Sequence, residues 1–359
     1  MTLAQRTSLN SIPAYRQGAT PGAAQKAFKL SSNENPYPPL DSVIAGLSSE
    51  LGTINQYPNA AAPELVGALA ARLGVEPETI ALGAGSVEVA GQLIHAIANP
   101  GDEVVFAWRS FEAYPILAHV AGATPVMVPL DADGAHDLAA MAEAINERTA
   151  LVFICNPNNP TGTVVDAAAV DAFMAKVPAH VLVVIDEAYV HFNTAGDSAI
   201  GLDFFRRYPN VAVLHTFSKA YGLAGLRIGY AVAPPAVAAN LRKTAVPFGV
   251  TALAQRAAVL SLEHEDELQV RIDDLVTARE SLLATLREAG ITVTESQANF
   301  IWLSTGDDTE AVDAELRAAG IWARAFAGDG IRISIGSPEA NAAIATAVIS
   351  ALSQAPAHV

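Results

Sequence analysis

The sequence predicts an α/β fold, with a mostly parallel sheet flanked by helices in a large domain and a smaller α+β domain after it. Three short, continuous apolar runs lie at residues 151–155, 181–185 and 211–214, and segments with helical spacing such as 167–177 separate them. This alternation indicates βαβ units and a sheet buried on both faces. After Arg227 the pattern changes to one long helical stretch and short strand-like runs, which predicts the second domain.

Three regions are expected along the chain. Residues 1–40 are rich in proline, serine and asparagine, and we expect an extended arm that packs near the small domain. Residues 41–249 are predicted to form the large domain and residues 250–359 the small one. With 359 residues the chain is long for one compact core, which agrees with two domains.

Helix boundaries are marked by glycine. The large domain is expected to hold one helix at 63–74, ending at Gly74, and another that follows Gly85 and runs to about residue 98. In the small domain a long helix over 268–286 is expected to stop at Gly290. Apolar runs at 291–294, 300–303 and 331–335 are typical of strands.

Composition excludes several classes of protein. The net charge of −16 argues against a nucleic-acid partner, and no apolar stretch reaches the roughly 18 residues of a membrane span. The first residues lack the layout of a signal peptide. The single cysteine, Cys155, rules out an internal disulfide and agrees with a reducing cytoplasm. No metal site is predicted.

The segment Thr216–Arg227 is the most informative part of the chain. It follows the apolar run 211–214 and holds Thr216, Ser218, Lys219 and Arg227 within twelve residues. Hydroxyls and a guanidinium bind phosphate, and a buried lysine between them loses its proton and becomes a usable amine nucleophile. Pyridoxal phosphate (PLP) carries a phosphate and an aldehyde on one ring, so we expect it to be attached to Lys219. An ordinary solvated lysine is the alternative.

Polar residues also follow the other two predicted strands. Asp186 would pair with the protonated pyridine nitrogen of PLP, or it caps a helix. Tyr189 would reach the phenolic oxygen of the ring. Asn159, in the turn-rich segment 156–162, would donate a hydrogen bond to the same oxygen, or the segment is only a turn.

Further candidates complete the predicted site. Backbone amides at a helix start suit a phosphate, and Phe111 would stack on the ring or belong to the core. Arg332 lies within an apolar strand-like run and would bind a carboxylate through its planar fork, as would Arg324, unless either forms a structural ion pair. The amides belong to Ala84, Gly85 and Ser86.

The ordered motifs Asn-Asn-Pro-Thr-Gly, Asp-Glu-Ala-Tyr, Thr-Phe-Ser-Lys and Arg-Ile-Gly, with a late Arg-Ile-Ser-Ile-Gly, resemble fold-type-I PLP-dependent aminotransferases over nearly the whole chain. More narrowly, they resemble the histidinol-phosphate aminotransferase family. The resemblance implies the same roles for the residues named above. It also implies a homodimer with the arm against the partner subunit, Tyr57 reaching the partner's cofactor phosphate, and Asn35 and Tyr15 near the substrate.

One departure concerns the substrate. Many histidinol-phosphate enzymes have Pro-Thr-Tyr where this chain has Arg-Ser-Phe at 109–111, and the segment 108–114 is similar to the aromatic (phenylalanine) aminotransferase branch, as is the arm 32–37. The resemblance therefore implies amino transfer from aromatic amino acids to 2-oxoglutarate, with Lys219 as base and then acid. The alternatives are a histidinol-phosphate aminotransferase, a PLP-dependent phosphoamino-acid decarboxylase and a non-catalytic PLP-binding protein.

Overall fold

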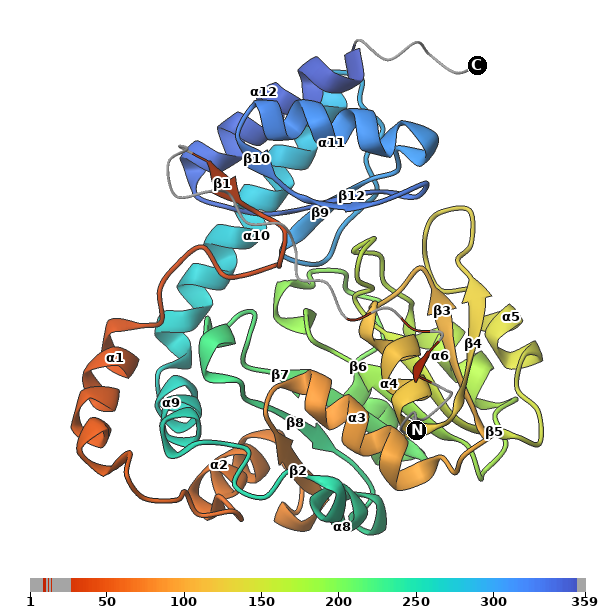
Figure 1. Cartoon of the computed structure of the whole chain (residues 1–359), viewed down its shortest axis with the longest axis vertical. Coiled ribbons are helices and arrows are strands. Elements are labelled where there is room, and N and C mark those ends of the chain that lie inside the picture. The colour runs from red at the N-terminus through yellow and green to blue at the C-terminus, as the bar shows by residue number, and fades with distance from the viewer. Residues whose placement is uncertain (1–8, 11, 13, 15–26, 354–359) are drawn as a thin grey trace, which may run out of the picture.

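A seven-stranded sheet forms the centre of the lower part of the molecule in Figure 1. The computed structural model describes residues 9–10, 12, 14 and 27–353. The strand order is β2-β8-β7-β6-β5-β3-β4, in which β8 runs antiparallel to both of its neighbours and the other pairs are parallel. The strands are β2 (Ile80–Gly83), β3 (Glu103–Trp108), β4 (Thr124–Pro129), β5 (Thr149–Cys155), β6 (Leu182–Asp186), β7 (Val211–Thr216) and β8 (Gly229–Val232).

Helices cover both faces of this sheet, which explains why β5, β6 and β7 are buried along their whole length. One face packs against α3, α4 and α8, and the other against α5, α6 and α7. These helices are α3 (Ser86–Ile97), α4 (Ala113–Ala121), α5 (Leu138–Glu143), α6 (Ala167–Met174), α7 (Gly201–Arg207) and α8 (Pro235–Thr244). The apolar runs at 151–155, 181–185 and 211–214 were correctly predicted as strands.

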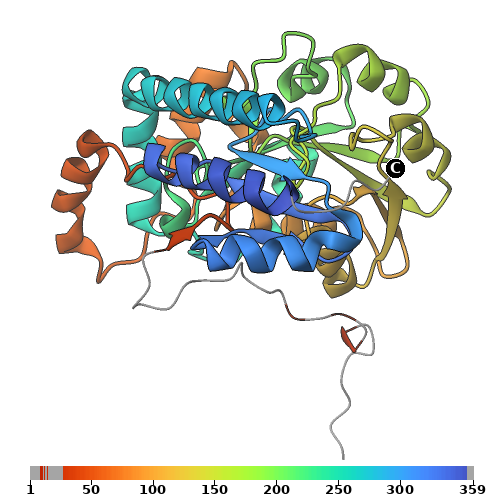
Figure 2. The ribbon, with the colours of Figure 1, turned by 90° about the horizontal axis from the view of Figure 1, so that it is seen from above.

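A second group of elements lies above the large sheet in Figure 1. A three-stranded antiparallel sheet has the order β11-β12-β9, and α12 lies between α10 and α11 (Figure 2). The predicted long helix is α10, and its C-terminal end is followed by Gly290 at φ 82°. The elements are α10 (Glu265–Glu288), β9 (Phe300–Leu303), α11 (Thr309–Ala318), β10 (Ile321–Trp322), β11 (Arg324–Phe326), β12 (Gly330–Ser334) and α12 (Pro338–Ser353).

The arm joins these two parts. Its strand β1 (Phe28–Lys29) pairs in parallel with β10, and the chain then passes into α1 (Asp41–Ser48). Helix α9 (Ala252–Glu263) packs against α1 and also against α2 (Pro63–Leu73), which ends at Gly74 as predicted. The limits of the three regions remain a prediction. Short 3-10 helices occupy Ser49–Thr53, Pro77–Thr79, Val190–Phe192, Ala224–Leu226 and Gly306–Asp308.

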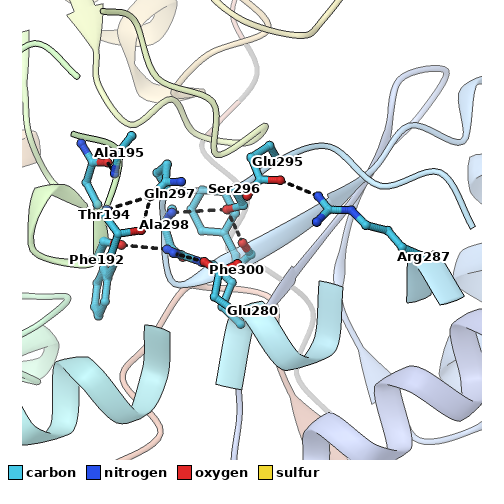
Figure 3. Close-up of polar contacts among 12 residues, drawn as sticks. Phe192, Thr194, Ala195, Glu280, Arg287, Glu295, Ser296, Gln297, Ala298 and Phe300 are labelled. Carbon is cyan, nitrogen blue, oxygen red and sulfur yellow. Dashed lines mark hydrogen bonds and ion pairs between the residues drawn. The ribbon is translucent and has the colours of Figure 1, made fainter. Parts of the chain in front are cut away.

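The prediction of a strand at 291–294 was wrong. The segment from 291 to 299 is irregular: it does not pair with the free edge of β9, and the amide of Gln297 donates instead to the carbonyl of Gly162 at 2.8 Å. Side chains hold the segment instead (Figure 3). Gln297 accepts hydrogen bonds from the amide and hydroxyl of Thr194, and Ser296 donates to the carbonyl of Phe300.

A fully buried arginine reinforces this junction. Arg279 of α10 donates to the carbonyl oxygens of Phe192 and Ala298, at 2.8 and 3.2 Å, and also binds Glu280. Phe192 lies just after β6, whereas Ala298 lies just before β9. The arginine therefore fixes the loop behind the end of β6 against the start of the small sheet.

Candidate active site

Polar residues converge where β5, β6 and β7 end. The three strands are parallel neighbours, so the segments that follow them meet at one edge of the sheet, where open α/β sheets bind ligands. The arm and the small sheet close this edge from the other side. A cavity between them is lined by Ser31, Ser32, Asn33, Phe111, Glu112, Asn159, Tyr189, Lys219, Arg324 and Arg332.

Lys219 is the amine in this cavity. Its Nζ donates to the carbonyl of Ser32 at 3.1 Å and lies 5.8 Å from the centre of the Tyr189 ring. Burial, together with a smaller contribution from the positive charge of Arg332, lowers the pKa of Lys219 to about 7. A large fraction of the side chain is therefore a neutral amine near pH 7, which is the nucleophilic form.

Asp186, the last residue of β6, is a buried carboxylate with both oxygens engaged. The hydroxyl of Tyr114 donates to it at 2.7 Å, and the amide of Ala188 donates at 3.2 Å. Burial raises the pKa of Asp186 to about 6, although both hydrogen bonds favour the charged form. A nearby cation would lower this pKa and be bound by the carboxylate.

Asn159, Tyr189 and Arg332 lie together. Arg332 donates through Nη1 to Oδ1 of Asn159 and through Nη2 to the carbonyl of Ser31 at 2.7 Å. This contact orients the amide of Asn159 and leaves its NH2 group as the donor. The hydroxyl of Tyr189 accepts from the side chain of Asn33 at 3.0 Å.

Four predicted phosphate-site residues surround one point at the end of β7. Arg227, at φ 56°, donates to Oγ of Ser218 at 3.3 Å, and Oγ1 of Thr216 accepts from the amide of Ser218 at 3.0 Å. Gly85 lies against the guanidinium at φ 84°, and a Cβ there would approach Nη2 of Arg227 to 2.2 Å. The position thus requires glycine, and it brings the start of α3 onto the arginine.

Two of the expected loop amides are already engaged. The amide of Ala84 donates to the carboxylate of Glu88 in the first turn of α3, and the amide of Gly85 donates to the carbonyl of Gly83 at 2.8 Å. Ser86 begins α3, and its nitrogen faces Gly229 of β8 so closely that a Cβ on the glycine would come within 2.5 Å. Arg227 contacts this loop directly, because its Nη2 donates to the carbonyl of Ala84 at 3.3 Å.

The remaining predicted site residues are divided between the cavity, the arm and the surface. Phe111 lines the cavity and meets Tyr114 edge-on, at 5.4 Å between ring centres. Arg324 lines it too, but its guanidinium is paired with Glu112. Asn35 donates to the carbonyl oxygens of Lys219 and Ala220, so in this chain it holds the lysine's backbone. Tyr57 lies on the surface, 83% exposed, and stacks on Phe248. Tyr15 lies outside the described residues.

Comparison with known proteins identifies the family. The family model described as aminotransferase class I and II matches residues 25–349. The chain belongs to the class I and II aminotransferases.

Curated relatives are similar over nearly the full length of this aminotransferase. An aromatic amino acid aminotransferase from Streptomyces avermitilis is 54% identical, with 94% of each chain covered. One from Cutibacterium acnes is 50% identical, with 99% of each chain covered. The crystal structure of histidinol-phosphate aminotransferase from Sinorhizobium meliloti in complex with pyridoxal-5'-phosphate aligns with a TM-score of 0.87 at 27% identity, covering 98% of both chains.

The residues of this aminotransferase fit the cofactor that the sequence predicts. A partly buried amine of lowered pKa, a buried carboxylate and a guanidinium approached by a glycine loop are groups that would suit the aldehyde, pyridine nitrogen and phosphate of PLP. Within the described ranges no cluster of three or more His, Cys, Asp or Glu residues can hold a metal ion. No helix in the same ranges is long and apolar enough to cross a bilayer.

Sequence reasoning missed five contributors to the site. Tyr114 supports Asp186, Asn33 supports Tyr189, Ser31 and Ser32 supply carbonyl oxygens, and Glu112 pairs with Arg324. Asn33 and Tyr114 lie in segments that the sequence had already singled out by their motifs. No local pattern, however, distinguishes these residues from ordinary arm or core residues.

Proposed function

We propose that this aminotransferase holds PLP at the edge of the large sheet and transfers the amino group of aromatic amino acids to 2-oxoglutarate. The observation that carries the catalytic part is the position of the Lys219 amine at the ends of β5, β6 and β7, in one cavity with Asn159 and Tyr189, where burial lowers its pKa to about 7. The aromatic substrate class rests on the names of relatives that are 50–54% identical over nearly the whole chain.

PLP, when bound, supplies an electron sink for the negative charge that develops at the substrate Cα. We assign Asp186 to the pyridine nitrogen, Tyr189 and Asn159 to the ring oxygen, and Phe111 to the ring face. Thr216, Ser218, Arg227 and the loop Ala84–Ser86 are assigned to the phosphate. The low pKa of Lys219 suits it to take the Cα proton and to return it in the same half-reaction.

Arg332 is proposed to bind the α-carboxylate of each substrate. Its guanidinium lines the cavity, and contacts with Asn159 and Ser31 fix its position before a ligand arrives. A planar fork that is held in place loses little freedom when it binds a carboxylate bidentately. Arg324, Asn35 and Tyr15 are assigned to the substrate side of the site.

Turnover of a substrate panel tests the proposal. The wild-type enzyme is expected to convert phenylalanine and 2-oxoglutarate to phenylpyruvate and glutamate, and Lys219→Ala is expected to lose turnover while the protein stays folded. Normal turnover by Lys219→Ala would refute the assigned mechanism. Release of carbon dioxide would favour a decarboxylase. Absence of reaction with every amino acid tested would favour a non-catalytic PLP-binding protein.

Histidinol phosphate is the second candidate substrate, because the Sinorhizobium meliloti histidinol-phosphate aminotransferase shares the fold over 98% of this chain. A comparison of kcat/KM for phenylalanine and histidinol phosphate, each with 2-oxoglutarate, separates the two. We expect phenylalanine to be preferred. A higher kcat/KM for histidinol phosphate would reverse the assignment.

We further propose a cytoplasmic homodimer. Two exposed apolar side chains, Val246 and Phe248, line a groove of about 560 Å³ beside β2. Three more, Leu51, Ile54 and Tyr57, are exposed on the segment that leads to this groove. Their exposure favours burial against a second copy, as the family resemblance implies for Tyr57. Light scattering would test this, with a dimer expected for the wild type and dissociation for Tyr57→Glu. A monomeric wild type would exclude it.

A further inference from the structure

A bidentate ion pair lies beside the proposed substrate position. Arg324 of β11 donates through Nη2 to both carboxylate oxygens of Glu112, at 2.8 and 2.9 Å, and through Nε at 3.2 Å. The two side chains are 19% and 28% exposed. Glu112 immediately precedes α4, which covers the large sheet, whereas Arg324 belongs to the small sheet. The pair therefore connects these two parts of the molecule at the wall of the cavity.

The neighbouring strand explains why Arg324 needs a counter-charge. Arg324 and Arg332 are directly opposite each other in the antiparallel pair β11–β12, so both guanidiniums extend from one face of the sheet into the same cavity. Arg332 donates to the amide oxygen of Asn159 and to the carbonyl of Ser31. Among the described residues that line the cavity, Glu112 is the one acid.

We propose that Glu112 is a specificity-determining residue that occupies Arg324 in place of a substrate carboxylate. This inference rests on the proposed function. With an aromatic side chain in the pocket, Glu112 neutralises Arg324, since a guanidinium that the substrate shields from solvent is unfavourable without a counter-charge. With a dicarboxylic substrate, the distal carboxylate takes Arg324, and Glu112 turns to the solvent that it already partly faces. One counter-ion replaces another, so the charge of the pocket is preserved.

A second ion pair between the same segments provides a matched control. Arg109 donates to Asp329 at 2.5 Å, which links the residues before α4 to the turn between β11 and β12. Neither residue lines the cavity. Removing this pair tests the effect of a weakened junction without changing the charge at Arg324.

Glu112→Gln is the primary variant, because it keeps the shape of the side chain and removes its charge. For a partly exposed pair, we expect kcat/KM for glutamate to rise about fivefold. The value for phenylalanine is expected to fall, because Arg324 is left without its carboxylate. Asp329→Asn is expected to keep the wild-type ratio of the two substrates. Equal changes for glutamate and phenylalanine in Glu112→Gln would overturn the proposal, as would the same change of ratio in Asp329→Asn.

Equilibrium binding gives a readout that does not depend on turnover. Calorimetry on the PLP-loaded enzyme would compare the affinity for succinate, an unreactive dicarboxylate, with the affinity for 3-phenylpropionate. Glu112→Gln is expected to bind succinate more tightly and 3-phenylpropionate more weakly. Arg324→Gln is expected to weaken the binding of succinate on the order of 100-fold. In the double variant, Glu112→Gln is expected to have no further effect on succinate affinity. Unchanged succinate affinity in Glu112→Gln would refute the proposal.

Failure of this inference and failure of the proposed function give different results. If wild-type enzyme converts neither phenylalanine nor glutamate, the proposed function is wrong. If it converts both and Glu112→Gln leaves their ratio unchanged, the function stands and the role of Glu112 is refuted.

Discussion

Replacing Tyr114 with phenylalanine removes the hydroxyl that donates to Asp186 at 2.7 Å and leaves one hydrogen bond on a buried carboxylate. A hydrogen bond to a charged group contributes about 1.5–3 kcal/mol, and about 1.4 kcal/mol corresponds to one pKa unit. The variant should therefore raise the pKa of Asp186 from about 6 to roughly 7–8.

The change in protonation predicts a pH-dependent loss of cofactor affinity. At pH 7 a carboxyl group of pKa about 6 is about nine-tenths ionised, whereas one of pKa 7–8 is roughly half to one-tenth ionised. If the ionised carboxylate pairs with the pyridine nitrogen, the affinity of PLP-free Tyr114→Phe for PLP should fall about two- to tenfold at pH 7 and recover by about pH 9.

Absorbance titrations of the PLP-free enzyme with PLP between pH 5.5 and 9 measure this effect. Tyr208→Phe is the control, because Tyr208 donates to Asp171, which lies on the surface and away from the site. The control should keep the wild-type profile. A Tyr114→Phe profile with the wild-type midpoint would refute the assignment of Asp186 as the ionised partner of the cofactor.

Three further predictions concern other residues. Acylation of Lys219 in the PLP-free enzyme should increase with pH through a midpoint near 7, because burial disfavours the cation; peptide mapping that places the midpoint near 10 would contradict this. Gly85→Ala forces the guanidinium of Arg227 aside and should weaken PLP binding about 10–100-fold, whereas Gly67→Ala, with open space at its Cβ, should not. Arg279→Met leaves two buried carbonyl oxygens without a donor and should lower the free energy of unfolding by about 2–4 kcal/mol in urea titrations; a loss below about 0.5 kcal/mol would show that the junction does not depend on this arginine.

The central strands were predictable because the sequence pattern that identifies each of them is local. Continuous valine, leucine and isoleucine runs identify β5, β6 and β7, and the polar residues that follow each run must lie at the same edge of a parallel sheet. The peripheral strands were harder to recognise. β4 is an edge strand with two prolines and an exposed methionine, and β10 has two residues, too few for a periodic pattern.

Partners distant in the sequence could not be predicted. Tyr114 and Asp186 are 72 residues apart, Asn33 and Tyr189 are 156 apart, and Glu112 and Arg324 are 212 apart. A single sequence gives no signal that pairs such residues, since their contact depends on how the arm and both sheets pack. For the same reason, the sequence named Arg324 as a candidate carboxylate ligand but did not identify the acid that already occupies it.

The arm and the last strand of the small sheet are joined by Asn33 and Ser334, which exchange two hydrogen bonds although 301 residues separate them. On a ribosome, the arm emerges early and its partner emerges 301 residues later. The carbonyl oxygens that contact Lys219 and Arg332 can take their places only after that. A nascent chain therefore cannot assemble the complete pocket, and amine chemistry begins only after the segment that holds Ser334 has left the ribosome.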